Sequence, residues 1–308
     1  MTTGFFSHDD FMKHNMGPEH PESPERLGAI ISYLADTGVG EKLDWIRPDE
    51  ATRDQLLLVH PEGYLHQLEM MQPTRGRVFT DPDTAMMPDT LRAARLAAGA
   101  CIEAVDMVLP GQLTNAFICA RPPGHHAERT RSMGFCFYNN IALAAMRALS
   151  FHGLDRVAIV DFDVHQGNGT ADIVGGDERI LMCSSFQHPF YPHSHVHRQP
   201  ENIVNIPIPA GSSPEAYRKA VEEGWLTKLN AFRPQLVLVS AGFDGHRLDP
   251  LAELNLETED YRWLTEMLVG VAAEHANDRL ISTLEGGYHL AALAESVNSH
   301  LDVLTQVS

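Results

Sequence analysis

Short apolar runs alternate along the chain with longer segments in which apolar residues recur at helical spacing. The apolar runs predict buried strands at 115–120, 156–161, 180–184, 235–240 and 280–284. The longer segments predict helices at 24–35, 91–108, 140–150, 214–229, 258–276 and 289–304. Strands that alternate with helices imply crossover connections, so we expect an α/β fold with a mainly parallel sheet and helices on both faces. Because no linker-like stretch divides the sequence, we expect a single domain over residues 1–308.

Polar motifs follow four of these runs, at the points where the predicted strands end. They are Arg121-Pro122-Pro123-Gly124-His125-His126, Asp161-Phe162-Asp163-Val164-His165, Gly242-Phe243-Asp244 and Glu285-Gly286-Gly287-Tyr288. In open parallel sheets, binding sites form in the crevice beyond the carboxyl ends of the strands. We therefore expect these motifs to meet in one site.

Two carboxylates and one imidazole among these motifs form a candidate metal site. Asp163 and His165 are one residue apart, so on an extended backbone they face the same side. Asp244 follows a second apolar run, and buried carboxylates without a cation would be costly. Hydrolytic zinc typically takes three protein ligands and leaves one position for water. One nitrogen and two oxygens suit zinc, and iron or cobalt would also fit.

His125 and His126 follow Pro-Pro-Gly, a lead-in that is biased toward extended backbone. Beside a metal, one of these rings is a candidate general base, because a metal lowers the pKa of water to about 7. Asp161 shares a face with Asp163 and is a candidate to orient a histidine. The alternatives are that the histidines lie on the surface and that Asp161 caps local backbone amides.

Aromatic side chains near these motifs are candidates for a substrate pocket. Tyr288 follows two glycines, and its hydroxyl could donate a hydrogen bond to an oxyanion. The segment that begins with Gly134 and Phe135, and the pair Phe190 and Tyr191, could form walls that grip an extended alkyl chain. The alternatives are that Tyr288 is a packed loop residue and that the aromatic loops form a small surface core.

Alternating histidines at His193, His195 and His197 raise the hypothesis of a second metal site. Histidine ligands usually donate their other ring nitrogen to an orienting carboxylate or carbonyl. Nothing nearby in the sequence supplies such a partner, and we expect these histidines to be exposed in a loop.

Composition excludes some classes of function. The 23 basic and 41 acidic side chains give a formal charge of −18, which argues against nucleic-acid binding and is compatible with cationic substrates. No run approaches the roughly 20 apolar residues that span a bilayer, and the N-terminus lacks the pattern of a secretory signal. Four widely spaced cysteines are typical of reduced core residues. We expect a soluble cytoplasmic protein without disulfides.

Taken together, the motifs resemble the zinc-dependent histone deacetylase superfamily, which includes bacterial deacetylase-like and acetylpolyamine amidohydrolases. The motifs that carry the resemblance are His20-Pro21-Glu22-Ser23-Pro24-Glu25-Arg26, 121–127, 134–140, 161–169, 240–244 with Asp249-Pro250-Leu251, and 285–288. The resemblance implies an arginase-like α/β fold with one zinc ion on Asp163, His165 and Asp244. It makes His126 the general base and acid, with His125 beside it and paired to Asp161.

By the same resemblance, Tyr288 is the oxyanion donor and Phe135 is one wall of the acyl-lysine channel. The other wall is Phe190 or Tyr191. The resemblance also implies a structural potassium ion, held by main-chain carbonyls around Asp161, Asp163 and His165 and by the hydroxyl of Ser184.

Two positions refine the resemblance. Asn168 stands where one branch of the family has an aspartate, which indicates a class II-like member. Leu251 stands where polyamine-specific members carry an acidic gatekeeper, and an apolar residue there favours acetyl-lysine or another acyl amide. The segment after Tyr191-Pro192 departs from the glycine-rich rim of the family.

Three hypotheses for function follow. The first is a zinc amidohydrolase that removes acetyl groups from lysine side chains of peptides or proteins. The second is deacetylation of acetylpolyamines or another small acyl amide, and the third is a non-catalytic module that binds acyl-lysine or metal. Every residue that hydrolysis needs is present, which favours an enzyme. The physiological substrate, the preferred acyl length and the oligomeric state, including a homo-oligomer, stay open.

Overall fold

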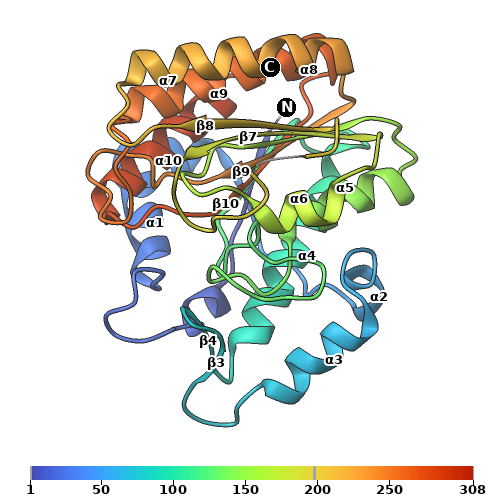
Figure 1. Ribbon diagram of the computed structural model, residues 1–308, viewed down its shortest axis with the longest axis vertical. Helices are drawn as coiled ribbons and strands as arrows, with labels where there is room; N and C mark the ends of the chain where they lie inside the picture. The colour runs from blue at the N-terminus through green and yellow to red at the C-terminus, as the bar shows by residue number, and fades with distance from the viewer. Residues whose placement is uncertain (1, 197–198, 308) are drawn as a thin grey trace.

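The computed structural model describes residues 2–196 and 199–307, and an eight-stranded sheet forms its centre (Figure 1). The strands lie in the order β2-β1-β5-β10-β9-β6-β7-β8, and the paired strands run parallel. Their bounds are β1 Thr3–Phe6, β2 Leu43–Ile46, β5 Asn115–Ile118, β6 Val157–Asp161, β7 Ile180–Gln187, β8 Ile203–Ile208, β9 Leu236–Ala241 and β10 Leu280–Leu284. The expected mainly parallel sheet is confirmed.

Helices cover both faces of this sheet. They are α1 Glu25–Thr37, α2 Arg53–Leu56, α3 Glu62–Met71, α4 Thr90–Val108, α5 Asn140–Ser150, α6 Asn168–Val174, α7 Pro214–Val221, α8 Thr227–Phe232, α9 Thr258–His275 and α10 Leu290–Leu304. The successive strands β5, β6 and β7 are placed progressively toward the β8 edge of the sheet. The successive strands β8, β9 and β10 are placed in the opposite direction, back toward β5. Because parallel crossovers are right-handed, the two directions put their helices on opposite faces. Accordingly, α7, α8 and α9 lie on one side of the sheet in Figure 1, and α4, α5 and α6 on the other.

Central strands position the functional motifs. The side chains of β6, β9 and β10 are buried along their whole length, as expected for strands that are covered on both faces. These three strands are neighbours, in the order β10-β9-β6, and β5 lies next to β10. Their carboxyl ends therefore bring together four segments that lie far apart in the sequence.

Three strands of the central sheet and one helix break were not predicted. The strands β1 and β2 have only four residues each, too few to show an alternating pattern. The edge strand β8 contains Pro207, a residue that is disfavoured inside sheets. The helix expected over 214–229 is interrupted by a π-helical turn at Glu222–Leu226, which separates α7 from α8.

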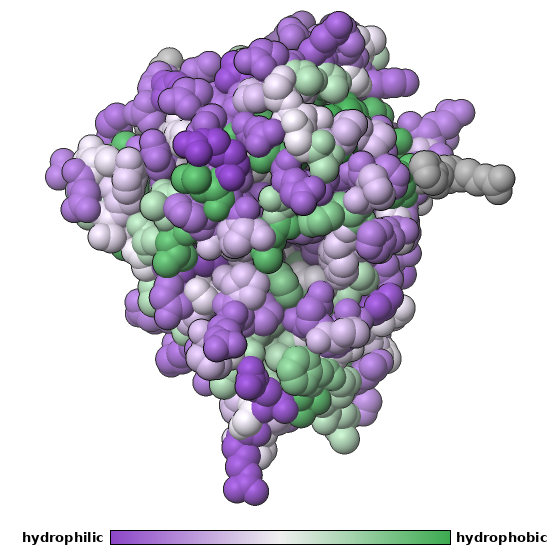
Figure 2. Space-filling view, turned by 60° about the vertical axis from the view of Figure 1, so that its left-hand side comes forward, coloured by the Kyte–Doolittle hydropathy of each residue, from purple (hydrophilic) through white to green (hydrophobic). Residues whose placement is uncertain are grey.

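The surface and the cysteines agree with the composition. The face of the molecule in Figure 2 is mostly hydrophilic, with separate hydrophobic patches.

The four cysteines are buried and free, so the expectation that they form no disulfide is confirmed. Within the described ranges, no helix combines the length and the apolar character that a membrane span requires.

His300 is a buried histidine whose pKa is shifted by the fold. Nδ1 of His300 lies 2.7 Å from Oγ1 of Thr265, and Nε2 lies 2.9 Å from Oγ of Ser282. Thr265 already donates its hydroxyl proton to the carbonyl of Tyr261, so it accepts from Nδ1 of the neutral ring. Burial lowers the pKa of His300 from 6.5 to about 3.

We expect this histidine to destabilise the fold in acid. Between about pH 6.5 and pH 3, the unfolded state binds a proton at His300 that the folded state does not. The free energy of unfolding therefore falls as the pH drops through this range, by up to about 1.4 kcal/mol per pH unit from this group. Urea titrations should show a shallower pH dependence for His300→Gln than for His66→Gln, which changes an exposed histidine. Equal slopes for the two variants would contradict this account.

Candidate active site

The carboxyl ends of β6 and β9 bring two acidic side chains and one histidine together. Asp163 and His165 follow β6, and Asp244 follows β9, the neighbouring strand. Nδ1 of His165 lies 3.0 Å from Oδ1 of Asp163 and 3.1 Å from Oδ2 of Asp244. One ligand atom of each residue lies within 4.8 Å of the others. The structure thus brings together the three residues, here called the metal set, that the sequence grouped as a metal site.

Backbone amides hold the remaining oxygens of both carboxylates. The amide of Gly286 donates to Oδ2 of Asp163 at 2.8 Å, and the amide of Val164 donates to Oδ1 of Asp244 at 2.9 Å. A Cβ at Gly286 would lie 2.1 Å from Oδ2 of Asp244, and a Cβ at Gly242 would lie 2.0 Å from Oδ2 of Asp163. Only glycine allows the backbone this close approach. Each aspartate therefore keeps one oxygen directed at His165.

This donor set fits a divalent cation. Tetrahedral zinc ligands at about 2.0–2.2 Å from the metal lie about 3.4 Å from one another, and the two separations from Nδ1 of His165 are 3.0 and 3.1 Å. Asp163 and Asp244 are 1% and 0% exposed, and two buried carboxylates side by side are costly without a compensating positive charge. The combination of one nitrogen and two oxygens suits zinc, and also iron or cobalt.

Two adjacent histidines next to the metal set are each held through Nδ1. Nδ1 of His125 lies 3.0 Å from Oδ2 of Asp161, and Nδ1 of His126 lies 2.7 Å from Oδ1 of Asn168. The side-chain nitrogen of Asn168 donates to Oε1 of Glu128 at 2.8 Å, which turns the amide oxygen toward His126. Because an amide oxygen can only accept, Nδ1 of His126 carries the proton. Nε2 of His126 is therefore left as a free base.

The two rings differ in their preference for charge. Burial lowers the pKa of His126 well below its ordinary value, and the neighbouring His125 adds to the lowering. Burial also opposes a charge on His125, but Asp161 and Asp163 outweigh it and raise the pKa of His125 well above its ordinary value. The pKa values of the two rings are thus shifted in opposite directions, although the rings lie side by side with centroids 4.0 Å apart.

A buried carboxyl that the sequence analysis did not assign fixes the histidine loop. Glu285, at the end of β10, accepts from the amide of Gly124 at 2.7 Å and from the amide of His125 at 3.1 Å. Its other oxygen accepts from the hydroxyl of Ser240 at 3.1 Å. Burial raises the pKa of Glu285 to about 7. Glu285 therefore holds the backbone of the loop through its amides, whereas Asp161 holds the ring of His125.

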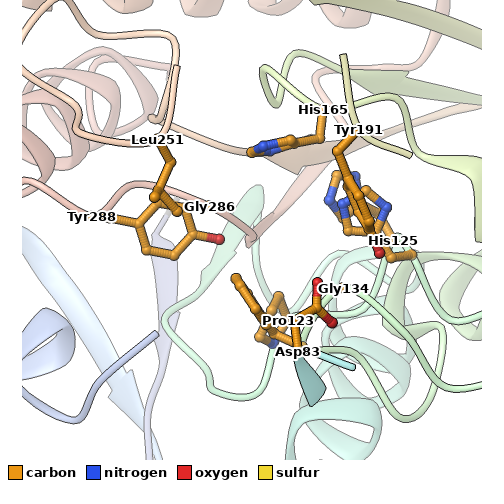
Figure 3. Close-up of a pocket in the computed structure, with 11 residues that line it drawn as sticks. Asp83, Pro123, His125, Gly134, His165, Tyr191, Leu251, Gly286 and Tyr288 are labelled. Atoms are coloured by element: carbon orange, nitrogen blue, oxygen red, sulfur yellow. The ribbon is translucent and has the colours of Figure 1, made fainter. Parts of the chain in front are cut away.

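Tyr288 lies across the pocket from the histidines, on the turn between β10 and α10. Gly287 before it has a φ of 119°, a conformation that favours glycine. The guanidinium of Arg26 lies 5.0 Å from the centroid of the Tyr288 ring and donates to the carbonyl of Gly287 at 2.7 Å. Figure 3 shows the Tyr288 hydroxyl directed into the pocket. The phenol is therefore placed to donate a hydrogen bond to a bound ligand.

His165, the two adjacent histidines and Tyr288 line one pocket (Figure 3). Its walls are Asp83, Pro123, His125, His126, Gly134, Phe135, His165, Tyr191, Leu251, Gly286 and Tyr288. The ring of Tyr191 stands edge-on to His126 with centroids 5.2 Å apart. Phe190 instead stacks on the ring of His165, also at 5.2 Å, and is absent from the described lining. Of these two adjacent aromatic residues, Tyr191 is therefore the one that lines the pocket together with Phe135.

Asp83 was missed by the sequence analysis. It lies in the turn of a hairpin formed by β3 Val78–Asp81 and β4 Thr84–Met86, and it lines the pocket. Strands this short carry no recognisable hydrophobic period. The turn residues Asp81 and Pro82 were the available signal for a loop, but they do not show where the loop lies.

Residues 20–304 match the family model of the histone deacetylase domain. The chain belongs to the histone deacetylase family. A probable deacetylase of Archaeoglobus fulgidus is 37% identical over 94% of this chain and 82% of its own length. A histone deacetylase-like amidohydrolase of Pseudomonas aeruginosa is 37% identical over 87% of this chain and 72% of its own. The crystal structure of the HDA15 HD domain superposes with a TM-score of 0.91 at 32% identity, over 99% of this chain and 90% of that one. The expected arginase/deacetylase fold and deacetylase activity class are confirmed.

The histidine-rich segment of this deacetylase is only partly as expected. His193 is exposed, as predicted. The prediction that His195 is exposed is wrong, because this residue is partly buried. Its backbone carbonyl accepts a hydrogen bond from the side chain of Asn205 at 2.7 Å. That hydrogen bond ties the segment to β8. His197 lies outside the described residues.

We predict that Gly286→Ala weakens metal binding by this deacetylase. The added Cβ would displace the carboxylates of Asp163 and Asp244, which it would approach to 2.6 and 2.1 Å. Elemental analysis after dialysis should find less zinc in this variant than in the wild type. Gly270→Ala is the matched control, because its Cβ would have no heavy atom within 4 Å. Equal zinc retention in both variants would show that the carboxylates do not hold the metal.

Proposed function

We propose that this deacetylase is a zinc-dependent amidohydrolase that removes acetyl groups from lysine side chains of peptides or proteins. The observation that carries the proposal is one pocket that His165 of the metal set, His126 and Tyr288 line together, with Nε2 of His126 as the unprotonated ring nitrogen. These groups together would supply a site for a Lewis-acidic metal, a base and an oxyanion donor. The proposed catalytic domain spans residues 1–308.

His126 is proposed to move the proton. When bound by the metal set, zinc would supply a Lewis acid and lower the pKa of water to about 7. Nε2 of His126 accepts the proton of the attacking water, since Nδ1 is committed to Asn168. The same nitrogen then protonates the leaving amine, so one ring serves as base and acid. His125, bonded to Asp161, is its electrostatic neighbour.

Tyr288 is proposed to stabilise the oxyanion. When the carbonyl carbon becomes tetrahedral, its oxygen gains negative charge and accepts a hydrogen bond from the Tyr288 hydroxyl. The rings of Phe135 and Tyr191 enclose the acyl-lysine stem and exclude water. Gly134 leaves room for the base, since a Cβ there would lie 2.4 Å from the His126 ring.

Two observations bear on the substrate. Leu251 lines the pocket and offers no charge to a polyamine nitrogen, which favours acetyl-lysine in a peptide. Against this, the polyamine deacetylase HDAC10 of Mus musculus is 35% identical over 96% of this chain, although this chain spans 47% of that protein. Asp83 also contributes an acidic group to the pocket lining. Acetylpolyamines or another small acyl amide therefore form the alternative substrate class.

We also infer a structural potassium ion near the metal set. The Ser184 hydroxyl on β7 is buried and has no hydrogen-bond partner among the described residues. Ser184 pairs with Asp161 across β6 and β7, so it lies beside the backbone carbonyls that the resemblance assigns to potassium. A hard cation that prefers oxygen ligands would satisfy that hydroxyl oxygen.

The proposed setting is the cytoplasm, without a nucleic-acid or membrane partner. The formal charge of −18 disfavours binding to phosphate backbones. Four buried free cysteines suit a reducing compartment. A homo-oligomer is compatible with all of these features.

Replacing Tyr288 by Phe should lower kcat on an acetyl-lysine peptide by about 10²–10³, the usual cost of losing one oxyanion donor. Its zinc content, measured by elemental analysis, should match the wild type. Tyr33→Phe, on the partly exposed face of α1, is the control and should keep full activity. Turnover that survives Tyr288→Phe would remove Tyr288 from the mechanism.

A chelator should abolish wild-type activity and zinc should restore it.

A substrate panel decides between the two substrate classes. Because Leu251 gives the pocket no acidic partner on its side, kcat/KM for an acetyl-lysine peptide should exceed that for acetylputrescine and acetylspermidine. The panel uses zinc-loaded wild-type protein and includes longer acyl groups on the same peptide. A clear preference for either polyamine would overturn the peptide assignment in favour of the alternative.

A further inference from the structure

Asp249 lies behind the pocket and contacts two of its walls through backbone amides. The residue is 6% exposed and is absent from the described lining of the pocket. Its Oδ2 accepts from the amide of Tyr288 at 2.6 Å and from the amide of His289 at 3.3 Å. Its Oδ1 accepts from the amide of Leu251 at 3.0 Å. One carboxylate thus joins the turn that carries Tyr288 to the loop that carries Leu251.

The turn at Tyr288 needs such an acceptor. It leads directly into α10, which begins at Leu290, and the first amides of a helix have no partner within the helix. The carbonyls of the same turn are already used, because Arg26 donates to Glu285 at 2.6 Å and to Gly287 at 2.7 Å. Arg26 therefore holds the carbonyls of the turn, and Asp249 holds its amides.

We propose that Asp249 is a positioning residue that acts through Tyr288. By fixing the Tyr288 amide, it sets the direction of the phenol, whose hydroxyl points into the pocket (Figure 3). By fixing the amide of Leu251, it also holds the Leu251 wall of the pocket in place relative to the Tyr288 side chain. This inference rests on the proposed function, since Tyr288 matters only if an oxyanion forms in the pocket. A misplacement of about 1 Å of such a donor can cost about 100-fold in rate.

A merely structural role would give different results. If Asp249 only stabilised the loop, its replacement would lower the melting temperature without a specific effect on kcat, and its effect would add to that of any catalytic variant. A positioning role instead makes the effects of Asp249 and Tyr288 overlap, because both act through one hydroxyl.

The test is a double-mutant cycle on the full-length zinc-loaded protein. Asp249→Ala should lower kcat on an acetyl-lysine peptide by about 10- to 100-fold, with KM and zinc content little changed. In the Tyr288→Phe background the same change should cost less than about 3-fold. Asp249→Asn keeps one acceptor oxygen and should fall between the wild type and Asp249→Ala. Asp10→Ala is the control, because Asp10 is 8% exposed and pairs with Lys13 and Arg92 away from the pocket.

Amide hydrogen exchange provides a readout that does not depend on activity. Asp249→Asn should speed exchange in the peptides that contain Leu251 and Tyr288 and leave the rest of the sheet protected. If Asp249→Ala does not fold, Asp249→Asn takes its place in the cycle. Equal losses of kcat in both Tyr288 backgrounds, or unchanged exchange in both peptides, would overturn the positioning role. A wild-type protein that hydrolyses no acyl amide would instead overturn the proposed function, and the inference with it.

Discussion

The arrangement of the site depends on one electrostatic constraint: two carboxylates are buried side by side and face one imidazole nitrogen. Asp163 and Asp244 are nearly inaccessible to water, and each directs one oxygen at Nδ1 of His165. Two negative charges in this position are unfavourable unless a cation compensates them. The glycines at 242 and 286 let neighbouring strand ends approach the carboxylates so closely that neither aspartate can turn away. The fold therefore holds together a donor set that a divalent ion would stabilise.

Buried acidic side chains also organise the rest of the site, but they do so through the backbone. Glu285 accepts from the amides of the histidine loop, and Asp249 accepts from the amides of the Tyr288 turn. His126 and Tyr288 thus lie on opposite sides of the pocket, each on a loop that a carboxyl group fixes. Loops held in this way keep a defined geometry, which matters most for the Tyr288 turn because two glycines precede the tyrosine. The parallel sheet supplies the frame, because its carboxyl ends bring these loops to one edge.

Much of this could be predicted from the sequence, because polar residues that interrupt apolar runs mark strand ends. The metal set and the adjacent histidines were found in this way, and the structure brings them together beside one pocket, which His165 and the two histidines line. The roles of Glu128 and Asp249 could not be predicted, because their partners depend on contacts between residues about 40 positions apart. The strand β1 forms by pairing with β2 and β5, and its own four residues show no pattern. The choice between Phe190 and Tyr191 depended on the path of the loop, which their shared aromatic character does not reveal.

The most direct test of the central claim is anomalous diffraction at the zinc absorption edge, from crystals of protein purified in the presence of zinc. The account predicts one strong peak at about 2.0–2.2 Å from Nδ1 of His165 and from one oxygen each of Asp163 and Asp244. A map without a peak at this position, in which Nδ1 of His165 remains hydrogen-bonded to both carboxylates, would contradict it.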